Sequence, residues 1–181
     1  MPLLNSLATP YAEALLQVAE SRQETDTVAA QARELLVLWH SSAQLREAMA
    51  SPVLEPEAKK AALAALFDGQ VTASVQNLLK LLADRQRIAV LDAVLERFLE
   101  LYRELRQITL AKVSSATPLS DEQQAQLNQK VQAIAGTQAV EFELSVDPAL
   151  IGGFVVNLGS QVIDASLAGQ VRRLGLALAK V

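Results

Sequence analysis

The hydrophobic pattern of this 181-residue chain changes its period once, near Arg106. Before that residue, apolar side chains recur at steps of three and four, which is the period of an amphipathic helix. After it, apolar and polar residues alternate over short stretches, which is the period of a half-buried strand. Because one layer type cannot satisfy both periods, we expect a mainly α protein: an N-terminal six-helix bundle in residues 1–105, followed by a small C-terminal α+β domain in residues 106–181.

Residues 1–105 contain six segments of helical periodicity, and the whole chain has only 7 glycines and 6 prolines to interrupt them. The first helix is expected to begin at Pro10, with Thr9 as its cap, because proline at the first helical position loses no hydrogen bond. The fourth is apolar on most sides and is expected to be buried, with Gly69 as its left-handed end. The helices after the first are expected at residues 26–40, 42–49, 57–67, 72–84 and 88–105.

Residues 106–181 combine strands with two helices. Residues 140–146 alternate strictly and give the clearest half-buried strand, and Ser120 followed by Gln123 is typical of a capping box. Gly159 and Ser160 separate two short apolar runs, which predicts a hairpin with a two-residue turn. The remaining expectations are a strand at 108–113, a helix that ends at Gly136, and a terminal helix capped by Ser166 with Leu167, Val171, Leu174 and Leu178 on one face.

Histidine and cysteine, two residue types that often serve as metal ligands or catalytic groups, are scarce in this chain. It has no cysteine and a single histidine, His40, whereas a protein metal site needs three or four ligands. The pair Gly152 and Gly153 precedes a strand and has no following Gly-Lys-Ser/Thr, so it does not fit a phosphate-binding loop. We therefore expect no catalytic, metal-binding or cofactor-binding residue, no cofactor, and no enzyme activity.

Charge and hydropathy limit the kinds of partner that this chain is expected to bind. The formal net charge is −4 without any block of like charges, so nucleic acid is not an expected partner. No apolar run approaches the roughly 18 residues of a spanning helix, so direct membrane insertion is not expected. Two dissimilar small domains favour an adaptor that binds different partners, while an unrelated helical regulator and a small enzyme with unrecognised chemistry stay open.

One segment, DPALIGGFVVNLGSQVIDASLAGQVRRL at residues 147–174, closely resembles the C-terminal signature of the delta subunits of rotary F-type ATP synthases. The same signature occurs in their mitochondrial counterpart, the oligomycin-sensitivity-conferring protein. Three further segments resemble that family in the same order, with Leu78 where many members carry phenylalanine: YAEALLQVA at 11–19, SPVLEPEAKKAAL at 51–63 and NLLKLLADRQRI at 77–88.

This resemblance implies a non-catalytic stator connector, present in one copy per ATP synthase complex. The bundle would bind N-terminal segments of the alpha subunits on the catalytic head, and residues 106–181 would bind the peripheral-stalk b subunits, so that the head resists rotor torque. The alpha segment is expected to dock as an amphipathic helix on the first and fifth helices. The residues implied there are Tyr11, Ala12, Leu15, Val75, Leu78 and Leu79, although groove and core residues share one periodicity and the sequence cannot separate them.

The signature residues are expected to fix the C-terminal fold, with stalk binding through nearby apolar surface such as the terminal helix. These residues are Asp147, Pro148, Gly152, Gly153, Gly159, Asp164 and Ser166. The resemblance further implies a peripheral membrane protein on the head side, at the cytoplasmic face. The ending GQVRR resembles cyanobacterial members, which implies the thylakoid membrane, and otherwise the bacterial plasma membrane; the lack of a presequence before the first helix favours a bacterial or processed protein.

Overall fold

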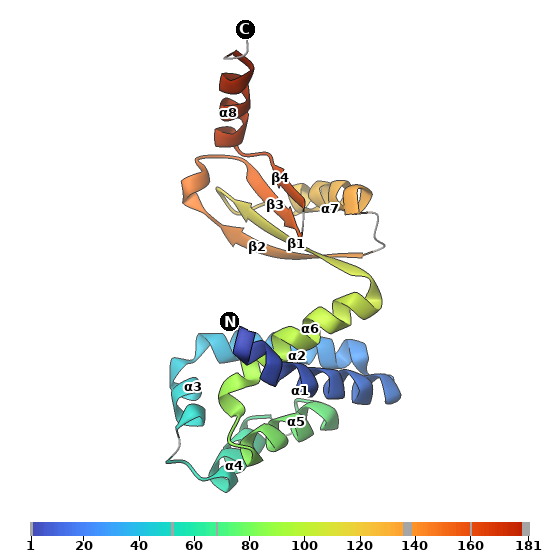
Figure 1. Cartoon of the computed structure of the whole chain (residues 1–181), viewed down its shortest axis with the longest axis vertical. Helices are drawn as coiled ribbons and strands as arrows, with labels where there is room; N and C mark the ends of the chain where they lie inside the picture. The colour runs from blue at the N-terminus through green and yellow to red at the C-terminus, as the bar shows by residue number, and fades with distance from the viewer. Residues whose placement is uncertain (1, 52, 68, 136–138, 160, 179–181) are drawn as a thin grey trace. The chain divides into compact units, whose positions relative to one another are not determined.

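The computed structural model describes residues 2–51, 53–67, 69–135, 139–159 and 161–178. The chain divides into two compact units, Met1–Glu104 and Leu105–Val181 (Figure 1). The first contains helices and the second contains a small sheet with helices, which confirms the expected mainly α fold with a helical bundle followed by an α+β part.

The described residues of the first unit form six α-helices and one short 3₁₀ helix. Apolar stripes from these helices meet in one core, in which Val28, Leu79 and Phe98 are at most 1% exposed. Such stripes can be removed from water only by packing on each other. The elements are α1 (Pro2–Ser21), α2 (Thr25–Ser41), α3 (Ala43–Ala50), α4 (Pro56–Phe67), α5 (Ala73–Asp84), η1 (Ile88–Val90) and α6 (Leu91–Arg106).

Polar side chains also tie α2 to the last two helices of the bundle. The Gln31 side-chain oxygen accepts hydrogen bonds from the backbone N–H and the hydroxyl of Thr72, at 2.9 and 3.0 Å. The Tyr102 hydroxyl of α6 donates to the Asp26 carboxylate at 2.9 Å. These bonds satisfy polar groups near the core and fix the neighbouring helices in register.

The expectation that the first helix begins at Pro10 is wrong, because α1 begins at Pro2 and carries Pro10 in its interior. An interior proline removes one helical hydrogen bond and crowds the preceding turn. Ala8, two residues before Pro10, is fully buried in the bundle. Burial of Ala8 therefore favours continuation of the helix through Pro10 in spite of the lost hydrogen bond.

The expectation that the fourth helix is buried on most sides is also wrong. On α4, Leu63 and Phe67 are buried, but Leu66 is 44% exposed and Ala61 and Ala65 are exposed. Alanine supports a helix without requiring burial, because its side chain offers little apolar area. An alanine-rich helix can therefore lie on a surface although its sequence is apolar all round.

The second unit contains a four-stranded sheet in the order β2-β1-β3-β4. Strands β1 and β2 are parallel and are connected through α7, whereas β3 pairs antiparallel with both β1 and β4. A parallel pair needs such a crossover connection, and the β3–β4 hairpin needs only a tight turn. The elements are β1 (Ile108–Ser115), α7 (Asp121–Ala135), β2 (Ala139–Val146), η2 (Pro148–Leu150), β3 (Phe154–Leu158), β4 (Gln161–Asp164) and α8 (Leu167–Leu178).

The core of the second unit lies between α7 and one face of the sheet. Leu127 and Val131 of α7 pack against Ala111, Val113 and Val156. The helix begins with the expected capping box: the Ser120 N–H donates to the Gln123 side chain at 3.0 Å, and the Gln123 N–H donates to the Ser120 hydroxyl at 3.3 Å. The expected helix end at Gly136 lies outside the described residues.

The strand at 140–146 is present, but its apolar face is only half covered. Val140 and Phe142 of β2 pack against the core, whereas Leu144 and Val146 are 47% and 54% exposed. The reason is position, because β2 is an edge strand and its second half extends beyond the apolar cluster that α7 covers. Alternation therefore predicted the strand correctly and its burial only in part.

Candidate partner-binding surfaces

A groove of about 250 Å³ lies between α1 and α5. Its walls are mainly apolar, and polar side chains from both helices stand among them. Val18 on one wall and Leu81 on the other are 40% and 43% exposed. The lining residues are Tyr11, Ala14, Leu15, Val18 and Arg22 from the first helix, and Ser74, Asn77, Leu78 and Leu81 from the fifth.

The groove exists because each of these helices carries two adjacent apolar stripes. On α5, Val75, Leu79 and Leu82 face the bundle core and are at most 1% exposed. Leu78 and Leu81 are three residues apart and therefore lie on one face of α5, next to the core-facing stripe. On this neighbouring face they line the groove. A complete core therefore lies beneath an apolar surface depression.

The structure divides the six residues that the sequence suggested for this surface. Tyr11, Leu15 and Leu78 line the groove, and Leu15 and Leu78 also belong to the core, because they are only 4% and 6% exposed. Ala12, Val75 and Leu79 are at most 1% exposed and face the core. Sequence reasoning missed Ala14, Val18 and Leu81, and the only available signal was their place beside the core stripe.

Polar contacts at the ends of the groove connect its walls to neighbouring segments. The Arg87 guanidinium donates a hydrogen bond to the Tyr11 hydroxyl at 3.1 Å. The Ser74 hydroxyl donates to the Glu24 carboxylate. These contacts hold Tyr11 and Ser74 in fixed places at the rim.

The signature in the second unit begins with Asp147, which caps the N-terminus of the short 3₁₀ helix η2. The Asp147 carboxylate accepts a hydrogen bond from the Ala149 N–H at 3.0 Å, and Pro148 occupies the start of η2. The Asp147 N–H donates to the Ser115 carbonyl at 2.8 Å. Asp147 and Pro148 therefore define where the edge strand ends and the chain turns toward β3.

Glycine is required at the three signature positions for different structural reasons. A Cβ on Gly152 would overlap the Leu167 side chain, and one on Gly153, which has a φ of 82°, would overlap the Ala165 carbonyl oxygen. Gly159 has a φ of 64° in the β3–β4 turn, but open space surrounds the place of its missing Cβ. Only Gly152 and Gly153 therefore mark close approach of the chain to the start of α8.

Asp164 and Ser166 form a linked cap at the start of α8. The backbone N–H and the hydroxyl of Ser166 both donate to the same Asp164 carboxylate oxygen, at 2.9 and 2.6 Å. The Ser166 hydroxyl accepts from the Gly169 N–H at 3.0 Å, which satisfies one free donor of the first helical turn. The hydrogen bonds from Ser166, and to a smaller extent the charges of Arg173 and Arg172, lower the pKa of Asp164.

Gly169 completes this cap, and sequence reasoning missed it. A Cβ at this position would overlap the Asp164 carboxylate, so any other residue would displace that carboxylate from its place in the cap. A glycine within a helix otherwise destabilises it, by about 1 kcal/mol relative to alanine. The presence of a helix-destabilising glycine at position 169 was the sequence signal that pointed to a close contact there.

Most of the described side chains of helix α8 are exposed. Gly169 is its only buried residue among those whose side chains are described, and Leu167 and Val171 are 50% and 68% exposed. Figure 1 shows the helix projecting from the end of the sheet. The side chains of Leu174 and Leu178, which the sequence placed on the same face, lie outside the described residues.

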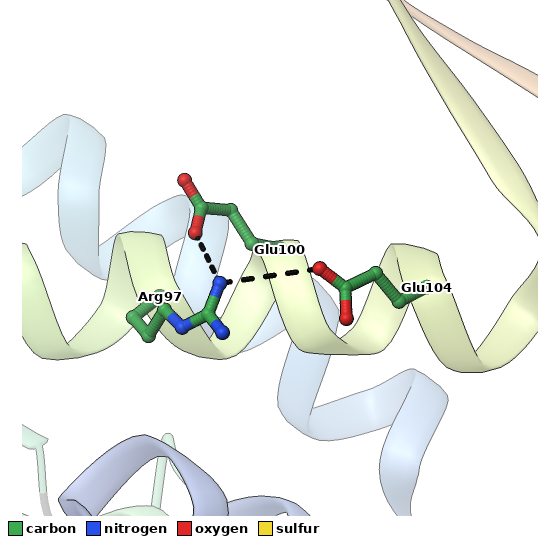
Figure 2. Close-up of polar contacts among 3 residues, drawn as sticks. All are labelled: Arg97, Glu100 and Glu104. Carbon is green, nitrogen blue, oxygen red and sulfur yellow. Dashed lines mark hydrogen bonds and ion pairs between the residues drawn. The ribbon is translucent and has the colours of Figure 1, made fainter. Parts of the chain in front are cut away.

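An ion-pair ladder runs along the exposed side of α6 (Figure 2). The Arg97 guanidinium lies 2.8 Å from the Glu100 carboxylate and 3.9 Å from that of Glu104. The hydrogen bond to Glu100 raises the pKa of Arg97. Spacings of this kind stabilise a helix modestly and indicate a structural role.

Two searches of the described residues were negative. No three His, Cys, Asp or Glu side chains lie close enough together there to hold a metal ion. None of the described helices is long and apolar enough to span a bilayer.

Comparison with known proteins gives matches over nearly the whole chain. The profile of the family described as ATP synthase delta (OSCP) subunit matches residues 7–178. A protein named ATP synthase subunit delta from Synechococcus sp. (strain CC9902) is 71% identical over 180 residues, which is 99% of each chain. The protein of the same name from Prochlorococcus marinus (strain MIT 9303) is 69% identical over 181 residues, which is 100% of each chain.

A more distant match concerns the fold alone. The structure resembles a chain in the cryo-EM structure of the Toxoplasma gondii mitochondrial ATP synthase hexamer, with a TM-score of 0.73 at 24% identity, over 96% of this chain and 97% of that one. The family profile covers both units described above, and the two bacterial relatives cover 99% and 100% of the chain. The chain therefore belongs to the ATP synthase delta (OSCP) subunit family.

Proposed function

We propose that this chain is a non-catalytic connector in the stator of a proton-translocating ATP synthase. In this proposal the bundle binds N-terminal segments of the alpha subunits on the catalytic head. The α+β unit binds the b subunits of the peripheral stalk. The chain contributes attachment, and the chemistry of ATP synthesis belongs to other subunits.

The observation that carries the proposal is the apolar groove between α1 and α5. Its lining follows the helical period on both walls, and it remains open to solvent. An amphipathic helix places residues at i, i+3, i+4 and i+7 into such a groove. An alpha-subunit segment that docks as a helix would cover Tyr11, Leu15, Val18, Leu78 and Leu81.

The exposed stripe of α8 supports the second attachment. Leu167 and Val171 lie one helical turn apart and are at least half exposed. Apolar residues in contiguous exposed positions favour a binding surface. A stalk subunit that covers this stripe would connect the static stalk to the head.

The connector needs affinity and stiffness, because rotation of the central stalk would otherwise turn the catalytic head. The Arg97 ladder stabilises α6, which reaches Arg106, two residues before β1 begins at Ile108. This role is consistent with a peripheral protein at the cytoplasmic face of the membrane, and relatives from Synechococcus and Prochlorococcus favour the thylakoid membrane.

The test is titration calorimetry of the full chain with a synthetic peptide of the alpha-subunit N-terminal segment from Synechococcus sp. (strain CC9902). Trp39 is only 4% exposed and does not line the groove, so its fluorescence is not a direct reporter. We expect saturable one-to-one binding, and we expect Val18→Asp to weaken it by about tenfold or more, as for anchors at the centre of an interface.

The matched control is Val37→Asp, because Val37 is 71% exposed on α2 and does not line the groove. Both variants should retain the thermal unfolding temperature of the wild type, since neither residue is buried. Equal weakening by the two variants would show that binding does not use the groove. Absence of binding by the wild type would refute the assignment of the alpha partner.

A further inference from the structure

Strand β2 has one backbone edge without a neighbouring strand. It lies at the end of the order β2-β1-β3-β4, and among the described residues only β1 pairs with it. The strand is 8 residues long, and its register with β1 continues through all of them without a bulge. Sheet edges are usually protected by a short strand, lysine, proline or a bulge. The 4-residue edge strand β4 fits that rule, whereas β2 has none of these features.

The second half of β2 carries exposed apolar side chains along this edge. Leu144 and Val146 are 47% and 54% exposed. They pair with Val113 and Ser115 of β1, which are only 1% and 4% exposed, and Val113 belongs to the core that α7 covers. Residues two apart on a strand share a face. Leu144 and Val146 therefore form an apolar shelf beside the covered core, directly along the open edge.

A buried polar atom of α7 borders this shelf. Leu127 packs on the sheet, and one flank of the helix, with Gln123 and Gln126, lines a pocket that Phe154 of β3 completes. Asn128 lies past Leu127 on the opposite flank, toward β2, which α7 also contacts. Its side-chain oxygen is enclosed and has no hydrogen-bond partner among the described residues, which is unfavourable. Because Asn128 is partly exposed, its amide can turn toward a donor that arrives at the shelf.

Charge indicates what kind of segment fits this edge. Residues 139–147 contain three acidic residues, Glu141, Glu143 and Asp147, and no basic one. The Glu143 carboxylate lies 3.0 Å from the Lys112 ammonium group and remains 58% exposed. Two β2 strands side by side would bring like charges together, which opposes pairing with a second copy of this chain. A strand with alternating apolar and basic residues is complementary, because its apolar side chains face the shelf and its basic ones face the carboxylates.

We propose that the open edge of β2 is a docking site for an extended segment of a partner protein, in which apolar residues alternate with lysine or arginine. The segment adds as a fifth strand to the four-stranded sheet, so that its backbone groups pair with the open edge. Its apolar side chains cover Leu144 and Val146, and one of its donors reaches Asn128. This site goes beyond the proposed attachments, because it uses neither the α1–α5 groove nor α8.

The test is titration calorimetry of the full chain with a short synthetic peptide in which lysine and valine alternate. We expect saturable one-to-one binding that weakens as salt rises. Two further peptides carry N-methyl groups on every second residue, one on the lysines and the other on the valines. Because successive N–H groups of a strand point to opposite sides, one of these peptides should lose binding and the other should retain most of it.

The variant that removes the shelf carries Leu144→Thr and Val146→Thr. It should weaken peptide binding by about tenfold. Its thermal unfolding should stay near that of the wild type, because both residues are about half exposed and threonine suits a strand. The matched control is Val162→Thr, since Val162 is 63% exposed on the opposite edge strand, and its binding should equal that of the wild type.

A second variant, Asn128→Leu, separates binding from stability. It should raise the thermal unfolding temperature, because it removes the unpaired oxygen, and yet weaken peptide binding. Equal binding by this variant would overturn the contact with Asn128.

The docking site itself is overturned if the wild type does not bind the peptide, if the shelf variant binds it as well as the wild type, or if both N-methylated peptides bind. Sedimentation of the chain alone tests the other occupant of the edge. A dimer that the shelf variant dissociates would assign the edge to a second copy of this chain and overturn the proposal. None of these outcomes changes the proposed roles of the α1–α5 groove and α8.

Discussion

The two units of the chain bury their apolar residues in different ways. In the bundle, large side chains such as Phe98, Leu79 and Leu82 are completely enclosed between helices. Among the described residues of the α+β unit, the largest fully buried side chains are valines: Val113, Val131 and Val156. The stability of the bundle therefore depends mainly on the volume of apolar side chains enclosed between its helices. The smaller unit depends more on backbone positions that permit close approach, such as Gly153.

This difference also shapes the two candidate surfaces. The bundle carries a depression, because a complete core beneath α1 and α5 leaves a second apolar stripe free on each helix. The α+β unit carries projecting residues, because α8 extends beyond the core that α7 covers. In the proposed function the groove would receive a helix from one partner, whereas the exposed stripe of α8 would itself be covered by another.

The largest effect expected from this comparison is in the bundle core. Phe98→Ala should lower the free energy of unfolding by about 3 to 5 kcal/mol, because it removes a fully buried ring and leaves a cavity. Urea unfolding followed by the fluorescence of Trp39, the only tryptophan, reports on this unit.

The control for that substitution is Leu66→Ala on α4. Leu66 is 44% exposed, so its truncation should cost less than about 1 kcal/mol. Similar losses from both variants would mean that enclosed volume does not dominate the stability of the bundle, and the contrast between the units would then disappear.

A backbone position should dominate in the α+β unit. Gly153→Val should destabilise that unit by roughly 2 to 4 kcal/mol, because the new side chain meets a positive φ and also overlaps the Ala165 carbonyl. Amide hydrogen exchange of β3 and β4 would detect the loss. The Trp39 unfolding transition should change little, since that residue belongs to the other unit.

The matched variant is Gly159→Val, which meets a similar φ of 64° in open space. It should cost only the conformational part, about 1 to 2 kcal/mol. The difference between the two variants then measures the close approach at the start of α8. Equal costs would show that the overlap at Gly153 relaxes freely.

Most elements of the fold could be predicted from local patterns because local physics determines them. The Ser120 capping box, the Ser42 cap of α3 and the positive φ of Gly69 each depend on residues near one another in sequence. The errors arose where distant parts of the chain decide. Pro10 lies inside a helix whose packing outweighs its local preference, and Leu144 is exposed because β2 lies at an edge.

The candidate surfaces were less predictable for the same reason. Ala12 and Leu15 are separated by one helical step, yet one faces the core and the other also lines the groove. Both positions satisfy the same periodicity, so only the placement of the neighbouring helix distinguishes them. The positive φ of Ile151 had no signal in the sequence at all, because isoleucine is not a residue that such turns favour.

The smallest expected effect concerns pH, and it separates the two units by sign. In the α+β unit, Ser166 lowers the pKa of Asp164, so this contribution to stability is complete above the ordinary aspartate pKa of about 3.9 and is lost as pH falls through the lower folded value. In the bundle, Asp84 and Glu57 raise the pKa of Lys60 above 10.5, so that contribution is complete below 10.5 and is lost only as pH rises through the raised value.

Asp164→Asn should therefore make the α+β unit less stable than the wild type near neutral pH, and the two proteins should converge in acid. Hydrogen exchange of the Gly169 amide at several pH values measures this convergence, with the Trp39 transition of the bundle as the internal reference. A difference that persists unchanged below the folded pKa of Asp164 would assign the effect of the substitution to altered packing against Gly169, since a lost charge cannot act where the wild-type carboxyl is already protonated.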